Sequence, residues 1–88
     1  MRVEYTPAFA RDLKRERNAE LKRRVERRIE ELKAATAITD VTRAVRVTAP
    51  GRYYRIRLGD FRLGFALVGD RVVLLRFMHR RDIYRYFP

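Results

Sequence analysis

Two Gly-Asp pairs, Gly59-Asp60 and Gly69-Asp70, constrain the fold of this chain more than any other feature. Each pair separates two segments in which apolar and polar residues alternate. A glycine at the first of two turn positions suits a type II′ β-turn, which is a common connection in β-hairpins. Alternation with period two is typical of strands that have one buried and one exposed face. The last third of the chain therefore predicts antiparallel strands joined by tight turns.

The first turn determines which residues of its hairpin lie opposite each other. With Gly59-Asp60 at the turn, Leu58 pairs with Phe61 and Arg57 pairs with Arg62. The apolar face, expected to pack under helices, is Tyr54, Ile56, Leu58, Phe61, Leu63 and Phe65. The opposite face carries Arg55, Arg57, Arg62, Gly64 and Ala66.

The second turn predicts how the last strand extends this pattern. Around Gly69-Asp70, Gly64 pairs with Leu75, and His79 joins the arginine face near Arg57. Three arginines and the single histidine of the chain would then surround Gly64, which has no side chain, and Ala66, which has a small one. This register predicts a shallow cationic pocket. Arginines in such a cluster favour phosphate as the ligand, although any one of them alone would be read as a solvated surface residue.

Arg76 does not fit this register. It falls on the same face as Leu74 and Met78, among the predicted core residues. Either a β-bulge redirects its side chain, or the long side chain reaches past the edge of the sheet. The sequence leaves both explanations open.

The N-terminal part of the chain predicts one strand and two helices. Arg2–Tyr5 has an extended pattern, and Thr6-Pro7 supplies an N-cap and a first helical residue for a helix that ends near Arg17. Asn18 is a candidate cap for a second helix that runs to about Ala35. The apolar ridge of this second helix, spaced by four, four and three residues, is Leu21, Val25, Ile29 and Leu32.

The segment between the helices and the hairpins is less regular. Residues 36–42 predict a loop, and residues 43–48 either a strand or an extended connection. The expected fold is α+β, with an N-terminal strand and a two-helix hairpin packed on one face of an antiparallel sheet, in the order β-α-α-β-β-β. No repeat or boundary is visible, so residues 1–88 are expected to form a single domain.

The charge indicates the kind of partner. The formal net charge is +11, from 22 basic and 11 acidic residues. Residues 43–88 hold eleven basic and three acidic residues, so the excess lies in the sheet half. A polyanion, and nucleic acid in particular, is the expected partner. The absence of cysteine and the single histidine argue against a zinc site. Without a membrane span or a signal peptide, the expected location is the cytoplasm.

The C-terminal tyrosines permit two interpretations. Tyr84 and Tyr86 either cover the open end of the core or, beside a cationic pocket, stack on a base or exchange a proton. Covering the core is the commoner use of terminal aromatic residues.

Two runs of sequence resemble a known family. The run YYRIRLGDFRLGF resembles the signature hairpin of the RelE/ParE superfamily of type II toxin–antitoxin toxins, and LLRFMHRRDIYR resembles its closing strand and tail. The resemblance covers essentially the whole chain, with departures at Phe61, Phe65 and Met78. It implies a metal-independent endoribonuclease, an mRNA interferase that cuts mRNA in the ribosomal A site and needs no cofactor. It also implies a cognate antitoxin, encoded beside the toxin, that holds it inactive.

The resemblance also implies roles for individual residues. Arg55, Arg57 and Arg62 match the basic residues of the hairpin, and His79, Arg80 and Tyr84 match the functional tail. The predicted catalytic residues are Arg57, Arg62, His79 and Tyr84. Because arginine stays protonated, His79 and Tyr84 are the predicted proton-transfer pair, and which of them is the acid and which the base stays open. The predicted RNA-binding residues are Arg55, Arg57, Arg80, Arg81 and Tyr86.

Two other functions are compatible with the same sequence. A ParE-like toxin that poisons DNA gyrase would share this fold, so the fold does not separate it from a nuclease. A noncatalytic RNA-binding module, or a toxin that has lost its activity, would also carry the basic face. The predicted convergence of Arg62, His79 and Tyr84 favours the nuclease.

Overall fold

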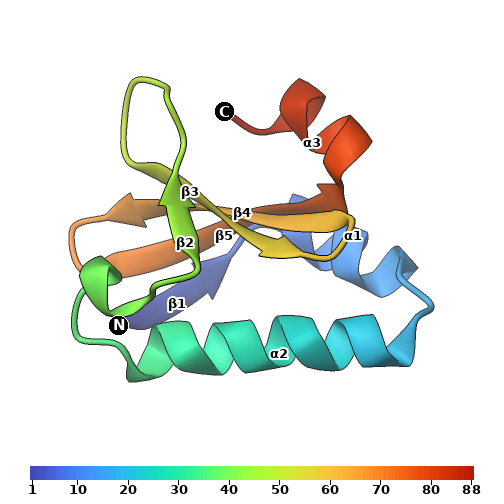
Figure 1. Ribbon diagram of the computed structural model, residues 1–88, viewed down its shortest axis with the longest axis horizontal. Coiled ribbons are helices and arrows are strands. Elements are labelled where there is room, and N and C mark those ends of the chain that lie inside the picture. The colour runs from blue at the N-terminus through green and yellow to red at the C-terminus, as the bar shows by residue number, and fades with distance from the viewer.

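The computed structural model describes residues 1–88 as one five-stranded sheet with helices on both faces (Figure 1). The strand order is β1-β5-β4-β3-β2. The elements are β1 (Arg2–Tyr5), α1 (Pro7–Arg15), α2 (Ala19–Ala34), a short 3-10 helix (Ile38–Asp40), β2 (Ala44–Arg46), β3 (Tyr53–Leu58), β4 (Phe61–Val68), β5 (Arg71–His79) and α3 (Arg80–Tyr86). No helix is both long enough and apolar enough to cross a membrane.

The predicted α+β class is confirmed, and the structure adds three features to it. The sheet is mixed instead of purely antiparallel as predicted, because β1 runs parallel to β5 while the other pairs are antiparallel. Residues 43–48, predicted as either a strand or an extended connection, contain the short edge strand β2. The C-terminal tail forms α3, which lies on the face of the sheet opposite α2 (Figure 1).

The capping residues begin both N-terminal helices as predicted. Thr6 Oγ1 accepts a hydrogen bond from the Phe9 amide at 3.1 Å, and Asn18 Oδ1 accepts one from the Leu21 amide at 3.1 Å. These bonds satisfy amides that have no partner within the helix. α1 ends at Arg15, two residues earlier than expected.

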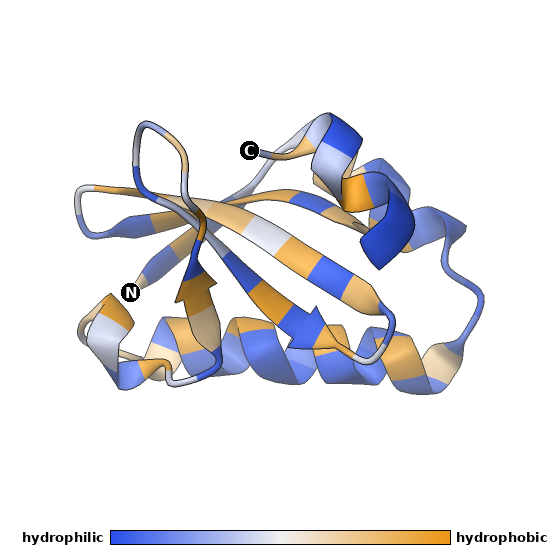
Figure 2. Ribbon diagram, turned by 45° about the horizontal axis from the view of Figure 1, so that its top comes forward, coloured by the Kyte–Doolittle hydropathy of each residue, from blue (hydrophilic) through white to orange (hydrophobic).

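The first hairpin has the predicted register. Gly59 has φ +60°, and no residue other than glycine has a positive φ, so the turn is type II′ as expected. Arg57 lies opposite Arg62, and Arg55 lies opposite Gly64. Figure 2 shows apolar and polar residues alternating along β3 and β4.

The second hairpin departs from the predicted register after its first half. Pairing follows the prediction up to Phe65 and Leu74, where the register shifts. Beyond that point Gly64 pairs with Arg76 instead of Leu75. A β-bulge of this kind inserts one residue into one strand and re-aims the side chains that follow. Of the two explanations for Arg76, the bulge is therefore correct.

The sheet separates two apolar groups of unequal size. The main core is a cluster of 14 buried residues between the sheet and α1 and α2. On the other face, Ile83 and Phe87 are buried beneath and beside α3 but do not belong to that cluster. This second group attaches α3 to the sheet.

Candidate functional site

The arginine face forms as predicted, and α3 adds a fourth arginine to it. We call Arg55, Arg57, Arg62 and Arg80 the arginine cluster. Arg62 Nη1 donates to the backbone oxygens of Gly59 at 2.8 Å and Phe61 at 2.9 Å, which orients its guanidinium. Arg55, Arg57 and Arg62 form no ion pair with a carboxylate, and Arg80 lies 3.9 Å from Asp60. The cluster is therefore largely uncompensated and suited to bind an anion.

The electrostatic environment of Arg62 reflects this crowding. Partial burial lowers the pKa of its guanidinium, and the positive charges of Arg57, Arg55 and Arg80 lower it further, against an opposing effect of Tyr84. Like charges this close repel each other unless an anion lies between them. A phosphate group would relieve that repulsion.

Tyr84 joins the cluster from α3. Arg55 Nη1 donates a hydrogen bond to Tyr84 Oη at 3.0 Å, and the Arg55 guanidinium carbon lies 5.5 Å from the centre of the tyrosine ring. The side chain of Tyr84 is 68% exposed, so it does not cover the core. Its hydroxyl is thus fixed beside the arginines and accessible to a ligand.

The predicted placement of His79 on the arginine face is wrong. Because of the bulge, His79 lies opposite Phe61, and the two rings meet edge to face at 5.5 Å. Its Nδ1 accepts a hydrogen bond from the Arg81 amide at 3.1 Å and caps α3. The misfit of Arg76 was the one sequence signal that indicated this shift.

The predicted pocket over Gly64 and Ala66 is also absent. The ring of Phe87 fills the space above Gly64, where a Cβ atom would lie 2.8 Å from it. The cluster is consequently an open surface at the margin of α3. The spacing of Ile83 and Phe87, four residues apart, was a helical signal that could have indicated this packing.

The remaining predicted RNA-binding residues lie on α3. Arg81 is exposed at its start. Tyr86 is 57% exposed, and its ring lies 5.1 Å from the Arg76 guanidinium, on the side away from Tyr84. Nowhere in the structure do three His, Cys, Asp or Glu side chains converge as a metal site would require.

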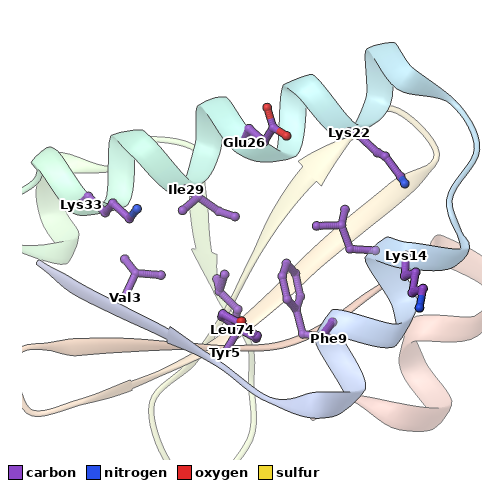
Figure 3. A pocket seen from close by; sticks show the side chains of 11 residues that line it. Val3, Tyr5, Phe9, Lys14, Lys22, Glu26, Ile29, Lys33 and Leu74 are labelled. Carbon is purple, nitrogen blue, oxygen red and sulfur yellow. The ribbon is translucent and has the colours of Figure 1, made fainter.

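A groove of about 520 Å³ opens between α1, α2 and β1, far from the arginine cluster. Figure 3 shows apolar side chains in it, among them Val3, Phe9 and Ile29. All three lysines of the chain line it together with one carboxylate: Lys14, Lys22, Lys33 and Glu26. We call this feature the lysine groove. The sequence did not predict this groove.

Comparison with known proteins identifies the family. A model of the ParE toxin of type II toxin–antitoxin systems (parDE) matches residues 3–84. Toxin RelE3 of Methanocaldococcus jannaschii is 33% identical over 89 residues, covering 100% of both chains. The chain superposes with a TM-score of 0.79 and 30% identity on a chain of the RelB-RelE antitoxin-toxin complex from Methanococcus jannaschii, covering 97% of this chain and 99% of that one.

A more distant structure shows the same fold. It is the archaeal RelE-RelB complex from Pyrococcus horikoshii OT3, with a TM-score of 0.66 at 22% identity and coverage of 90% and 93% of the two chains. The full-length match to a RelE toxin, the ParE model and the shared fold agree with the hairpin and tail motifs. The chain therefore belongs to the RelE/ParE superfamily of type II toxin–antitoxin toxins.

Proposed function

We propose that this protein is an endoribonuclease toxin that cuts mRNA in the ribosomal A site. The observation that carries the proposal is the arginine cluster, which has almost no compensating carboxylate and holds the hydroxyl of Tyr84 at 3.0 Å from Arg55. Guanidinium groups bind phosphate oxygens with paired hydrogen bonds and stabilise charge that develops at phosphorus.

The proposed reaction uses the RNA itself as the nucleophile. The 2′-hydroxyl loses its proton, its oxygen bonds to phosphorus, and the bond from phosphorus to the 5′-oxygen breaks. The departing 5′-oxygen takes up a proton, which leaves a 2′,3′-cyclic phosphate and a 5′-hydroxyl. The proton of the 2′-hydroxyl passes to water, and the hydroxyl of Tyr84 donates the proton that the departing 5′-oxygen takes up, after which water reprotonates the phenolate. Arg62 is suited to bind a phosphate oxygen, because its guanidinium stays protonated and is oriented by the backbone oxygens of Gly59 and Phe61.

The role of His79 changes in this proposal. Its ring lies against Phe61 and its Nδ1 is engaged at the start of α3, so we assign it to capping instead of proton transfer. Of the two predicted proton-transfer residues, only Tyr84 then lies beside the arginine cluster.

The openness of the site explains why a ribosome would be required. In-line attack needs the 2′-oxygen, the phosphorus and the leaving oxygen to be aligned. The cluster has no cavity that could impose this alignment, because Phe87 fills the space over Gly64. A decoding site that already holds the codon would supply it, and the protein would then act in the cytoplasm.

The proposal is tested by mapping mRNA ends on programmed ribosomes with the full chain. We expect cuts within the A-site codon, and Tyr84→Phe should slow them roughly 10²-fold, in line with the loss of a proton-transfer group. Arg85→Ala removes a charge from the same helix at an exposed position and serves as the matched control. Intact mRNA in the presence of the wild-type protein would refute the proposal.

A gyrase-directed toxin is the alternative function. The matched family model is described as a ParE toxin, which favours this reading. Induction in a bacterial host separates the two functions. Gyrase-linked DNA breaks with intact mRNA would indicate the gyrase target, and the Tyr84→Phe change should then leave toxicity unaltered.

We also propose that the lysine groove binds the antitoxin through an amphipathic helix with an apolar face and acidic flanks. Three lysines against one glutamate around an apolar floor match that chemistry. The relatives in the Methanococcus and Pyrococcus structures are in complex with RelB antitoxins.

The groove proposal is tested with the protein encoded in the adjacent reading frame. Lys22→Glu should slow association and flatten its dependence on salt concentration. Arg11→Glu makes the same charge change at an exposed position of α1 that does not line the groove, and it should bind as the wild type does. Equal effects of both changes would contradict docking in the groove.

A further inference from the structure

β5 loses its strand partner on one side before it ends. β1 pairs with it only as far as Tyr5 and Leu74, so the outer edge of residues 75–79 faces no strand. Buried backbone amides need a hydrogen-bond partner. On this edge the carboxylate of Asp12, from α1, accepts a hydrogen bond from the Phe77 amide at 3.0 Å. Asp12 thus takes the place of a neighbouring strand.

The same carboxylate binds Arg76 with both of its oxygens. Arg76 Nε donates to Oδ2 at 2.7 Å, and Nη2 donates to Oδ1 at 3.0 Å. The side chains of Asp12 and Arg76 are 6% and 22% exposed, so salt screens this pair less than the surface pairs. The bulge directs Arg76 toward the face that carries α3. The ion pair therefore connects α1 to the opposite face around the edge of the sheet.

Arg76 is in turn in contact with α3. Its guanidinium carbon lies 5.1 Å from the centre of the Tyr86 ring. Tyr84 is two residues earlier, about 200° around the helix, where it meets Arg55. A helix of seven residues is not stable alone, so its position depends on such contacts. Two arginines, one on each side, thus add to the buried Ile83 and Phe87 in fixing the rotation of α3.

We propose that Asp12 is a positioning residue for Tyr84. By holding Arg76 against Tyr86, it fixes the rotation of α3 and thereby the place of the Tyr84 hydroxyl beside Arg55. The consequence for cleavage rests on the proposed function of Tyr84, whereas the consequence for α3 does not. Asp12 contacts no residue of the arginine cluster. It lies on α1, outside the two runs of sequence that resemble the toxin family.

The test compares Asp12→Asn and Arg76→Lys with the wild-type full chain. Asn keeps an acceptor for the Phe77 amide but removes the ion pair, and Lys keeps the charge but loses the paired hydrogen bonds. Hydrogen–deuterium exchange should become faster in α3, including at the Phe87 amide bonded to Ile83. The kcat of cleavage should fall roughly 10- to 100-fold with little change in KM, because misplacement of a reacting group costs this much. Arg76→Lys should change both in the same direction and by less.

Glu4→Gln is the matched control. It breaks the ion pair of Glu4 with Arg71, at 3.1 Å, across the β1–β5 pair without any link to α3. It should leave α3 exchange and cleavage unchanged. If Asp12→Asn does not fold, as judged by thermal unfolding, Arg76→Lys decides the question by the same measurement.

The outcomes separate the two proposals. Unchanged α3 exchange in both variants would overturn the positioning role, whether or not cleavage falls. Faster α3 exchange together with slower cleavage supports it. Faster α3 exchange in a protein whose wild type leaves mRNA intact supports the positioning role and refutes the nuclease.

Discussion

The arginine cluster and the lysine groove lie on opposite faces of one sheet and present positive charge in different ways. In the cluster, guanidinium groups crowd together almost without carboxylates, and a tyrosine hydroxyl is held among them. In the groove, ammonium groups surround an apolar floor. Planar guanidinium groups suit bidentate binding of phosphate, whereas mobile ammonium groups at an apolar rim suit a flexible acidic segment. The contrast indicates one face for RNA and another for a protein partner.

The arginines of α2 show that basic residues alone do not make a site. Arg23 and Arg27 both pair with Glu20, and Arg28 pairs with Glu31. These pairs satisfy one another at the helix surface and contribute little to stability. What distinguishes Arg55, Arg57 and Arg62 of the arginine cluster is the absence of such partners, and Arg80 has only the exposed pair with Asp60 at 3.9 Å.

The largest expected effect is that of Arg62→Ala on cleavage. Loss of a donor that stabilises transition-state charge should lower the cleavage rate roughly 10²- to 10³-fold. Affinity for the antitoxin should not change, because Arg62 lies outside the lysine groove. Ribosome-bound mRNA cleavage and titration calorimetry check the two results. Arg17→Ala, at an exposed position between α1 and α2, is the charge-matched control. If Arg62→Ala cleaved mRNA at the wild-type rate, the arginine cluster would not be the surface that cleaves RNA.

Ile29→Ala should have the opposite pattern, with weaker antitoxin binding and unchanged cleavage. Removal of apolar surface from the floor of the groove should weaken antitoxin binding by about 1–2 kcal/mol, or roughly 5- to 30-fold. The cleavage rate should stay at the wild-type value. Calorimetry with the antitoxin provides the measurement, and thermal unfolding shows whether the variant keeps its core. A parallel loss of cleavage would show that the surfaces are coupled.

His79 provides a smaller effect that tests its revised role. His79→Ala removes the side chain that caps α3 and should destabilise that helix by about 1 kcal/mol. His79→Asn replaces it with another capping residue and should cleave close to the wild-type rate. Comparing the two variants by cleavage and by hydrogen exchange of α3 separates capping from proton transfer. Complete loss of cleavage in His79→Asn would instead indicate that His79 takes part in proton transfer.

The smallest effect concerns the paired arginines of α2. Hydrogen bonds from Arg23 and Arg27 lower the pKa of Glu20, so its contribution to stability is present above its ordinary pKa and is lost as pH falls through the lowered value. Arg23→Ala should return this pKa toward its ordinary value while cleavage and antitoxin binding stay unchanged. NMR titration of Glu20 measures the shift. A change in cleavage would show that α2 belongs to the nucleic-acid surface.

The first hairpin shows what could be predicted from local sequence. Gly59-Asp60 defines the turn, and alternation then determines that Arg57 faces Arg62. The caps Thr6 and Asn18 likewise indicate the helix starts correctly. Each of these depends on a few neighbouring residues, so short-range rules suffice.

The second hairpin shows where such rules fail. A single inserted residue at Leu75 reverses the faces of everything that follows, which moves His79 away from the arginines. The bulge lies where β5 pairs with β4, and the opposite edge of β5 beyond it is completed by Asp12, more than sixty residues earlier in the chain. Alternation within the strand contains no information about that contact.

The sequence by itself determined the α+β fold, the helix starts, the first register and the arginines of β3 and β4. These follow from period, turn residues and caps, which act between neighbours in the chain. Only the tertiary structure decided which residues join those arginines. Tyr84 and Arg80 reach the cluster because α3 folds back over Gly64, while His79 turns away because β5 has one extra residue where it pairs with β4. Contacts between distant segments set these positions, and their energies depend on packing and on buried hydrogen bonds.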